Sequence, residues 1–469
     1  MDVQKKSAEI AALRAEIEER SGGESGARER LMRLFDEGTF VEVGAFVRQR
    51  PTEYGACDGP EAVVTGYGAV DGALVFAFAQ DGAVMKGALS EMHAQKIKTL
   101  LSMALRADAP VVSFLDCCGM KISEGMDALG GYGEILSLCG EIRGEIPHVC
   151  VVNGVCAGAM SFLPAFADYT VMLKSAELFL AAPSVVAARG GETCGDAENA
   201  YESGIASVIC DDFDAALTAV REFFNAFDDA AASDDPNRLT PEIADLLSEE
   251  HYDVRRLIAA VADDGKYTEF SSGNAANLVT ALIHLDGVTC GVVANQPAAD
   301  DGALDAAACV KGAKFIEFCD NFEFPVITFT DTAGFAAKAQ NIADSALLLS
   351  AYTSASTVKL TLITGKAFGA GYLSMGTKHT GADVVLAYPT AQIAALPADT
   401  GAVFLGQQQI AAAGQPAEKR QELIARYADT LASPLQAAQR GAVDDIIDFA
   451  TTRQLLISSL NLFLEGDAE

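Results

Sequence analysis

The chain has 469 residues, and a rough prior of ~150 residues per domain indicates two or three domains. Hydrophobic residues make up 50% of the sequence and charged residues 21%, which excludes a disordered, collagen-like or coiled-coil chain. The formal net charge is −32, from 33 Lys and Arg against 65 Asp and Glu. A surface of this charge repels nucleic acid and anionic membranes, so neither is expected as a partner.

The first 45 residues predict a charged helix followed by an amphipathic helix that ends at Asp36-Glu37-Gly38. The opening residues do not combine a basic tip with an apolar core, so a signal peptide is not expected. The expected location is therefore cytoplasmic.

Short apolar runs rich in β-branched residues alternate with helical stretches along the rest of the chain. This alternation is typical of an α/β fold with largely buried strands. The runs that predict strands are 111–115, 149–152, 171–173, 326–329, 360–363 and 384–387, and the helical stretches include 90–105 and 303–320.

One segment, residues 148–167, has no full charge and about the length that a membrane span requires. It contains Asn153, Gly158 and Pro164, and Asp168 follows it directly. These residues favour a buried strand, a turn and a helix over a membrane span.

An internal repeat organises the chain. Residues 110–116 (PVVSFLD) and 325–331 (PVITFTD) are separated by 215 residues, and further similar segments keep nearly the same separation. The repeat predicts two copies of one domain. The acidic segment 228–237, which contains Pro236, is the candidate linker, so the predicted domains are 1–235 and 236–469.

In both copies an apolar strand leads into a glycine turn that opens a helix. These turns are Gly158-Ala159 and, 211 residues later, Gly369-Ala370-Gly371. Small residues let a ligand approach the backbone, and the first N–H groups of a helix have no partner within that helix. Each such donor can stabilise a developing oxyanion by about 3 kcal/mol. The alternative, that the glycines only let helix and strand pack closely, stays open.

Other candidate residues have more ordinary interpretations. Asp116 and Asp331 end apolar strands, where an aspartate most often caps the following turn. His93 lies at a helix start after Ser90 and is interpreted as a solvated position. The 11 cysteines contain no C-x-x-C pair and the five histidines are scattered, so we expect core thiols and no metal site.

Four lysines are the positive charges nearest in sequence to the first glycine turn: Lys86, Lys96, Lys98 and Lys121. In so acidic a protein they could hold the phosphates of a nucleotide-like ligand. The alternative is that they lie on solvated helix faces.

Further motifs follow one another along nearly the whole chain. They include Ala27-Arg-Glu-Arg-Leu31, Gly131-Tyr132-Gly-Glu134, Cys156-Ala-Gly158, Tyr252-Asp-Val254, Gly291-Val-Val-Ala-Asn-Gln-Pro297, Gly376-Thr-Lys-His379 and Tyr388-Pro-Thr-Ala391. Together with the glycine turns, these motifs resemble the carboxyltransferase subunit of biotin-dependent acyl-CoA carboxylases and of the related sodium-pump acyl-CoA decarboxylases. The propionyl-CoA carboxylase β chain typifies that family.

The resemblance implies two tandem crotonase-like (ClpP/crotonase spiral) domains in a hexamer that is a trimer of dimers. It implies carboxyl transfer between carboxybiotin on a carrier protein and a short-chain acyl-CoA, through an oxyanion-stabilised enolate. No acid/base side chain and no metal in this chain are required. The partners that it implies are a biotin carboxyl carrier protein and either a biotin carboxylase or a membrane decarboxylase subunit.

The resemblance also assigns site residues. The backbone of Gly158 and Ala159 is expected to hold the thioester oxygen, and the backbone of Gly369, Ala370 and Gly371 the ureido oxygen of biotin. The family has Gly-Gly at the first turn, but Ala159 keeps the N–H group that the role needs. The remaining expected residues are Lys86, Gly119, Lys121, Gly131 and Tyr132 on the CoA side and Gly334, Phe335, Phe368 and Tyr372 on the biotin side.

Two other functions stay open on the sequence alone. A crotonase-type acyl-CoA hydratase or isomerase would need a carboxylate base, for which Glu124 and Glu134 are the nearby options. A non-catalytic, CoA-binding assembly subunit would keep the fold with a degenerate site, which the altered glycine motifs favour.

Overall fold

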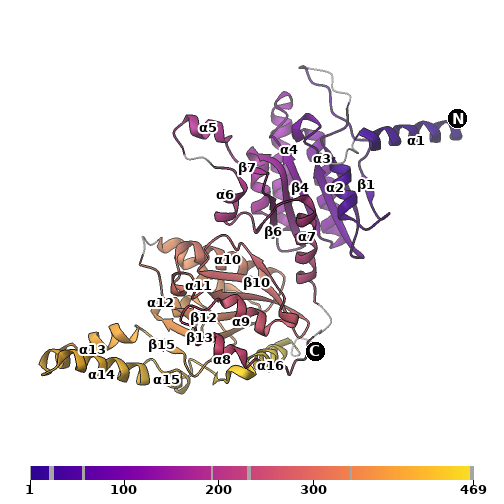
Figure 1. Cartoon of the computed structure of the whole chain (residues 1–469). Coiled ribbons are helices and arrows are strands. Elements are labelled where there is room, and N and C mark those ends of the chain that lie inside the picture. Colours follow the sequence, from indigo (N-terminus) through magenta and orange to yellow (C-terminus); the bar gives the residue numbers. More distant parts are fainter. Residues whose placement is uncertain are drawn as a thin grey trace. The chain divides into compact units, whose positions relative to one another are not determined.

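The computed structural model describes residues 2–20, 26–54, 59–191, 194–229, 234–337 and 341–464, without the side chains of residues 18–20. The chain forms two compact units, Met1–Phe223 and Phe224–Glu469. The boundary between them falls within helix α7 (Phe213–Phe227), shown in Figure 1. Part of the predicted linker, residues 230–233, lies outside the described residues, and the boundary at residue 235 stays a prediction.

Unit 1 is built on one sheet with the strand order β1-β2-β3-β4-β5-β6-β8, and β7 pairs with the far part of β5. Strands β1 to β3 are antiparallel, whereas β3, β4, β5, β6 and β8 run parallel. The strands are β1 (Val41–Val43), β2 (Val63–Val70), β3 (Ala73–Gln80), β4 (Val111–Cys117), β5 (His148–Ala157), β6 (Tyr169–Leu173), β7 (Glu177–Phe179) and β8 (Val208–Cys210).

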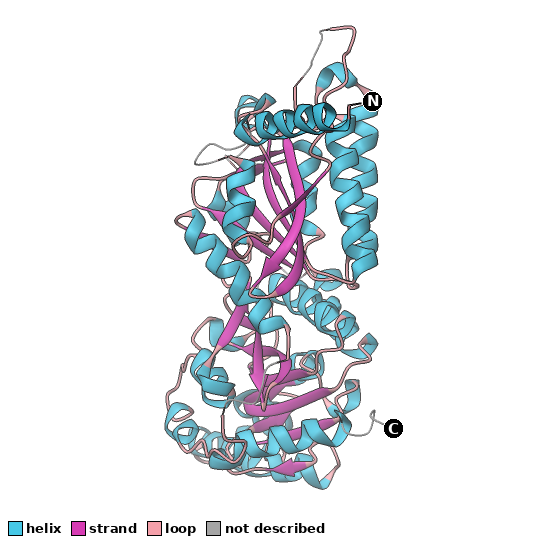
Figure 2. Ribbon diagram, turned by 90° about the vertical axis from the view of Figure 1, so that its right-hand side faces the viewer, coloured by secondary structure: helices cyan, strands magenta, loops and turns pink. Residues whose placement is uncertain are grey.

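Helices cover this sheet, as the ribbon view in Figure 2 shows. The α-helices are α1 (Val3–Arg20), α2 (Ala27–Leu34), α3 (Glu91–Ala107), α4 (Met126–Ile142), α5 (Pro183–Ala188), α6 (Ala197–Glu202) and α7. Short 3-10 helices are η1 (Met85–Gly87), η2 (Ile122–Glu124) and η3 (Gly158–Ala165).

Unit 2 repeats this arrangement. Its sheet has the order β16-β14-β13-β12-β11-β10-β9, and β15 pairs with the far part of β13, as β7 does with β5. The strands are β9 (Tyr267–Phe270), β10 (Leu278–Leu285), β11 (Val288–Asn295), β12 (Val326–Thr332), β13 (Lys359–Phe368), β14 (Val384–Ala387), β15 (Gln392–Ala394) and β16 (Asp445–Ile446).

The helices of unit 2 include a long helical hairpin, α13 with α14. The α-helices are α8 (Glu242–Leu246), α9 (Val254–Val261), α10 (Ala306–Asn321), α11 (Ile342–Ser354), α12 (Gly369–Ser374), α13 (Ala398–Ala412), α14 (Pro416–Thr430), α15 (Pro434–Gln439) and α16 (Thr452–Leu464). The 3-10 helices are η4 (Asp263–Gly265), η5 (Asp300–Gly302), η6 (Lys378–Thr380) and η7 (Phe449–Thr451).

The two sheets correspond strand for strand, so the predicted α/β fold and its strands are confirmed. The central strands β4, β5, β12 and β13 are buried because helices cover both of their faces. The covering helices begin at side-chain caps in equivalent positions. Ser90 accepts the N–H of His93 at 3.0 Å to begin α3, and Asp305 accepts the N–H of Ala308 at 2.9 Å to begin α10.

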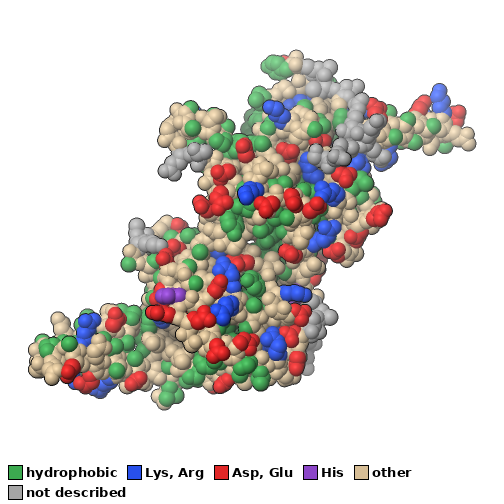
Figure 3. Space-filling model, viewed as in Figure 1, with side chains coloured by type: hydrophobic (Ala, Val, Ile, Leu, Met, Phe, Trp, Pro, Cys, Tyr) green, Lys and Arg blue, Asp and Glu red, His purple; other side chains and the backbone are tan. Residues whose placement is uncertain are grey.

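The uncharged segment 148–167 forms β5 and then η3, which confirms a strand followed by a turn and a helix. Among the helices of the described ranges, none is long and apolar enough to cross a membrane. Acidic side chains occur over the surface of both units, with Lys and Arg scattered among them, on the face that Figure 3 shows. The cytoplasmic location stays a prediction.

His93 is not solvated, contrary to the sequence-based expectation. Its side chain is fully buried, because it lies on the same face of α3 as Ile97, Leu100 and Ala104, which faces the core. Burial, with a smaller contribution from Lys96, lowers the pKa of His93 to about 3, so the ring is neutral.

The cysteine interpretation is confirmed for the thiols of the apolar runs. The ten cysteines within the described ranges are free thiols. Those that are buried as expected are Cys139, Cys150, Cys156, Cys290, Cys309 and Cys319.

The pH dependence of stability that Asp168 produces provides a test of the fold. Its carboxylate accepts the N–H of His148 at 2.8 Å, while burial raises its pKa to about 7. An unfolded aspartate titrates near pH ~4, so the folded state binds more protons between these values and loses stability as pH rises through them. We expect Asp168→Asn to remove this pH dependence, which a shift of about three pKa units puts at ~3–4 kcal/mol, measured by urea unfolding between pH 4.5 and 8. A stability difference between the two proteins that does not change with pH would contradict this assignment.

Candidate functional site

The first glycine turn stands where β5 leaves the sheet of unit 1. Gly158 has φ +65°, a conformation that favours glycine, and a Cβ added there would meet no atom within 4 Å. Open space therefore adjoins the turn. The N–H groups of Gly158 and Ala159 open η3 and precede its first internal hydrogen bond, so they are available to a ligand.

The end of β4 lies beside this turn, because Cys117 pairs with Cys156 in the ladder. Beyond Cys117, the chain turns at Gly119, which has φ +123° and open space on its Cβ side. The carbonyl of Gly119 accepts the N–H of Leu89 at 2.9 Å, and the carbonyl of Lys86 accepts the N–H of Cys118 at 3.0 Å. The structure therefore brings Lys86 and Gly119, two predicted CoA-side residues, to the end of the strand.

The predicted residues Gly131 and Tyr132 lie on α4, where both contribute to packing. A Cβ on Gly131 would come within 2.6 Å of the Ala94 Cβ, so glycine here lets α4 approach α3 closely. Tyr132 is buried, and its hydroxyl lies 3.5 Å from the Cys117 Sγ. Tyr132 therefore supports the strand end behind the turn.

The four lysines do not form one cationic cluster. Lys96 is buried, and its Nζ donates to the Val63 carbonyl at 2.7 Å. In unit 2 the repeat places Lys311 at the equivalent position, where its Nζ donates to the Leu278 carbonyl at 2.8 Å. A buried lysine that ties a helix to β2 or β10 is thus part of the repeated fold. The sequence did not show this role, because a lysine on a helix suggests solvent.

The remaining three lysines differ in burial and in whether an acidic side chain lies next to them. Lys121 is buried and lies 2.8 Å from Glu124, and Lys98 lies 3.0 Å from Glu134. Lys86 is exposed on η1. Of the four, Lys86 is therefore the one best placed to meet a phosphate.

The carboxylates considered as bases are engaged in the fold. Glu124 is paired with Lys121 and also accepts the N–H of Glu91 at 2.7 Å. Unit 1 has two histidines: His93 is buried, and so is His148, at the start of β5, where burial lowers its pKa to about 4. Among these histidines and glutamates, none is placed at the turn as a free acid or base, whereas the turn itself presents backbone donors.

The second glycine turn stands at the end of β13 in unit 2. Gly369 has φ +54° and begins α12. Gly371 packs against Gly334, since a Cβ on Gly371 would lie 2.7 Å from the Gly334 Cα. Ala370 is exposed between the two glycines. The turn and the Gly334 loop, both predicted on the biotin side, are therefore in contact.

Three aromatic residues were also predicted on the biotin side. Phe368 is buried and directly precedes Gly369. Phe335 forms a bridge with Leu304, next to the hydrogen bond between the Gly334 carbonyl and the Leu304 N–H. Tyr372 follows the turn and packs against an apolar cluster that includes Ile363. All three border the turn, although Phe368 serves mainly as core.

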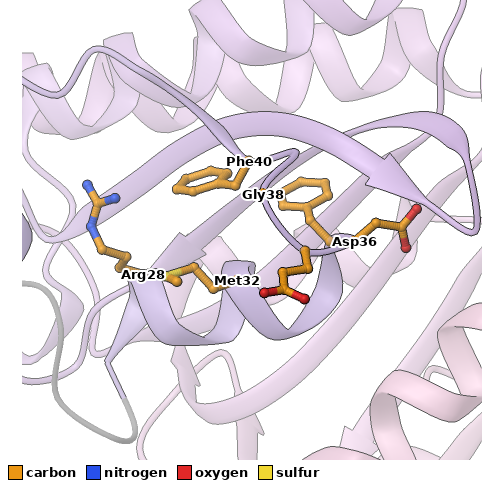
Figure 4. A pocket seen from close by; sticks show the side chains of 7 residues that line it. Arg28, Met32, Asp36, Gly38 and Phe40 are labelled. Carbon is orange, nitrogen blue, oxygen red and sulfur yellow. The ribbon is translucent and has the colours of Figure 1, made fainter.

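A pocket of about 510 Å³ lies apart from the predicted residues, along α2 (Figure 4). Two of its polar side chains have structural partners: Arg28 pairs with Glu42, and Asp36 accepts the N–H of Gly72 at 2.9 Å. We therefore assign it no ligand. Within the described ranges there is no group of three or more His, Cys, Asp or Glu side chains that could hold a metal ion.

The family model for the carboxyl transferase domain matches residues 18–468, nearly the whole chain. The chain belongs to the carboxyl transferase family. It is 37% identical to the methylmalonyl-CoA decarboxylase subunit alpha of Propionigenium modestum, over 100% of this chain and 96% of that protein. It is also 37% identical to the mitochondrial propionyl-CoA carboxylase beta chain of Mus musculus, over 94% of this chain and 85% of that protein.

A solved structure of transcarboxylase 12S, described as a hexamer assembly, matches with a TM-score of 0.94 at 34% identity. The match covers 99% of this chain and 96% of that one. It confirms the predicted fold of two crotonase-like units and the predicted family. This chain is accordingly a carboxyltransferase.

The contact between Gly371 and Gly334 predicts a sensitive position in this carboxyltransferase. Gly371→Ala should push the two loops apart, because overpacking costs about 1–3 kcal/mol and shifts backbone. We expect carboxyl transfer to fall at least tenfold, measured as initial rate per folded protein. Gly414→Ala is the matched control, because a Cβ at Gly414 would meet no atom within 4 Å. Equal activity of the two variants would contradict a functional role for this contact.

Proposed function

We propose that this carboxyltransferase moves a carboxyl group between a short-chain acyl-CoA of the methylmalonyl type and biotin on a separate carrier protein. The observation that supports this proposal is the doubled glycine turn. Each unit ends its central strand, β5 or β13, in a positive-φ glycine that opens a helix, at Gly158 and at Gly369. Two such turns suit a reaction in which two different oxygens must be held.

On the CoA side, the backbone at Gly158 and Ala159 would hold the thioester oxygen as the enolate forms. Preorganised N–H donors stabilise the charge that develops on this oxygen, and each can contribute about 3–4 kcal/mol. The open space at Gly158 admits the ligand. Because the histidines of unit 1 are buried, binding and orientation rather than side-chain proton transfer would carry this half of the reaction.

On the biotin side, the residues present fit a ureido group. The turn at Gly369–Gly371 presents the first N–H groups of α12, and its exposed Ala370 leaves the backbone accessible. These donors would hold the ureido oxygen and orient the ring. When bound, biotin carries the carboxyl group and supplies the ring nitrogen to which that group is attached.

The names of the relatives suggest the assembly. One relative is a decarboxylase subunit, another is a carboxylase beta chain, and the 12S structure is described as a hexamer assembly in a multienzyme core. We propose that this chain likewise forms a hexamer and works with a biotin carrier protein. A biotin carboxylase would drive the reaction toward carboxylation, and a membrane decarboxylase subunit would drive it toward decarboxylation.

The proposed reaction is tested with purified protein, methylmalonyl-CoA and free biotin. We expect biotin-dependent loss of the carboxyl group, followed as formation of propionyl-CoA. No turnover of methylmalonyl-CoA or malonyl-CoA, even with the carrier protein present, would overturn the proposal.

Ala159→Pro tests the oxyanion role in the same assay. Proline removes one N–H group and is tolerated in the first turn of a helix. We expect kcat to fall about 10²–10³-fold, as for loss of one oxyanion donor. Binding of propionyl-CoA, measured by calorimetry, should change less than threefold. Ala159→Gly, which keeps the N–H group, is the control. Equal losses of turnover and binding would argue against the role.

Two lysines with contrasting positions test how the CoA phosphates are held. We expect Lys86→Ala to weaken CoA binding about 5–30-fold, the usual effect of losing one charge-assisted contact. Lys96→Met should leave the CoA dissociation constant within about twofold, because the Lys96 ammonium is directed to the Val63 carbonyl. The reverse order of effects in calorimetry would place the phosphates elsewhere.

A further inference from the structure

The ladder between the two central strands of each unit is interrupted at one aspartate. In unit 1, Leu115 pairs with Val152 and Cys117 pairs with Cys156, so the single residue Asp116 faces three residues of β5. In unit 2 the register shifts in the same way, and Asp331 faces residues 364–366 of β13. We call the three-residue segments 153–155 and 364–366 the strand bulges. Bulges of this kind redirect a strand and occur next to active sites.

The aspartate side chain occupies the space inside each bulge. A Cβ on Gly154 would lie 2.3 Å from the Asp116 Oδ1, and a Cβ on Gly82 would lie 2.3 Å from its Oδ2. A Cβ on Gly365 would likewise come within 2.4 Å of the Asp331 carboxylate. Glycine is therefore required around the carboxylate in both units, and the bulge closes tightly on it.

Backbone N–H groups of the bulge point to the carboxylate. Within the bulges, Lys366 donates its N–H to the Asp331 Oδ1 at 2.8 Å and the N–H of Val155 interacts with Asp116. The N–H of Gly82, in the loop after β3, also interacts with Asp116. The backbone of each aspartate is fixed as well. The N–H of Asp116 donates to the Gln80 side chain and that of Asp331 to the Asn295 side chain, both at 3.1 Å.

The two aspartates have different charge partners. An Arg30 guanidinium nitrogen lies 4.0 Å from the Asp116 Oδ2, whereas the Tyr252 hydroxyl and the Lys366 charge face Asp331. Burial raises the pKa of both carboxyl groups, so neither environment is arranged simply to stabilise the charge. What the two units share is the bulge, its glycine and its N–H donors.

We propose that Asp116 and Asp331 are positioning residues that hold the strand bulges in the shape that aims the two glycine turns. From Val155, the last residue of the bulge, β5 pairs with β7 instead of β6 for three residues, and Gly158 follows at once. In unit 2, β13 changes from β14 to β15 in the same way before Gly369. The direction of the oxyanion donors thus depends on where the bulge sets the strand. This inference rests on the proposed function of the turns.

The simpler alternative is that each aspartate only stabilises the fold. The chain offers a matched control, because Asp168 also accepts a backbone N–H of β5, that of His148, but at the opposite end of the strand from Gly158. If Asp116 only stabilises the fold, substitutions of Asp116 and of Asp168 should have similar effects on kcat. If Asp116 positions the turn, only its substitution should lower kcat.

The experiment compares Asp116→Asn, Gly154→Ala and Asp168→Asn in the whole protein. Asparagine replaces one acceptor oxygen of Asp116 with a donor that would face backbone N–H groups, and the methyl group that Gly154→Ala adds would displace the carboxylate from the other side. We expect each of the first two variants to lower kcat at least tenfold per folded protein, with the dissociation constant for propionyl-CoA within threefold. The kcat of the double variant D116N/G154A should lie no more than about threefold below that of the less active single variant, because both substitutions act on one bulge. D168N should stay within twofold of the unmodified protein.

Amide hydrogen exchange gives a readout that does not depend on activity. In D116N and G154A, exchange in a peptide covering residues 153–160 should become at least tenfold faster, while D168N leaves it unchanged. The proposal would be overturned if D116N matched D168N in both turnover and exchange. It would also be overturned if exchange in D116N became faster while its turnover stayed that of the unmodified protein. Absence of turnover in the unmodified protein would count against the proposed function alone, because the exchange comparison would still show whether Asp116 holds the bulge.

Discussion

The structure depends on one constraint: the regular pairing of a central parallel strand, β5 or β13, must be interrupted, yet the strand must still end at a defined position. A regular ladder uses every N–H group of an interior strand, so it leaves none for a ligand. In both units a bulge around an aspartate interrupts the regular pairing of the strand. A glycine at positive φ and a short helix follow the bulge. In the proposed site, the N–H donors therefore arise from backbone geometry, which the side chains around the bulge would maintain.

A site of backbone donors has consequences for the sequence. The proposed site calls for glycines and small residues rather than histidines or paired carboxylates, and at Gly154 and Gly365 a Cβ would meet the aspartate carboxylate. The proposed role allows Ala159 in the first turn, because alanine keeps its N–H group. The acidic surface is compatible with such a site, since the donors at the turns and the exposed Lys86 can act locally.

The repeat, the strands and the glycine turns could be predicted because periodicity, apolar runs and glycine positions are local signals. The roles of His93, Lys96 and Asp116 could not. Each role depends on what another element places against the residue: the core face of α3, the Val63 carbonyl, or the bulge of β5. The sequence did contain one signal for the aspartates. In each copy of the repeat, Asp116 or Asp331 ends one apolar run, and a glycine, Gly154 or Gly365, stands two residues after the end of the next strand run.

The oxyanion role of the first glycine turn is tested most directly by a crystal structure of this protein with propionyl-CoA bound. We expect the thioester oxygen to lie within about 3.2 Å of the Ala159 nitrogen, beside the bulge that encloses Asp116. A thioester bound in unit 1 whose oxygen meets neither the Gly158 nor the Ala159 N–H group would contradict it.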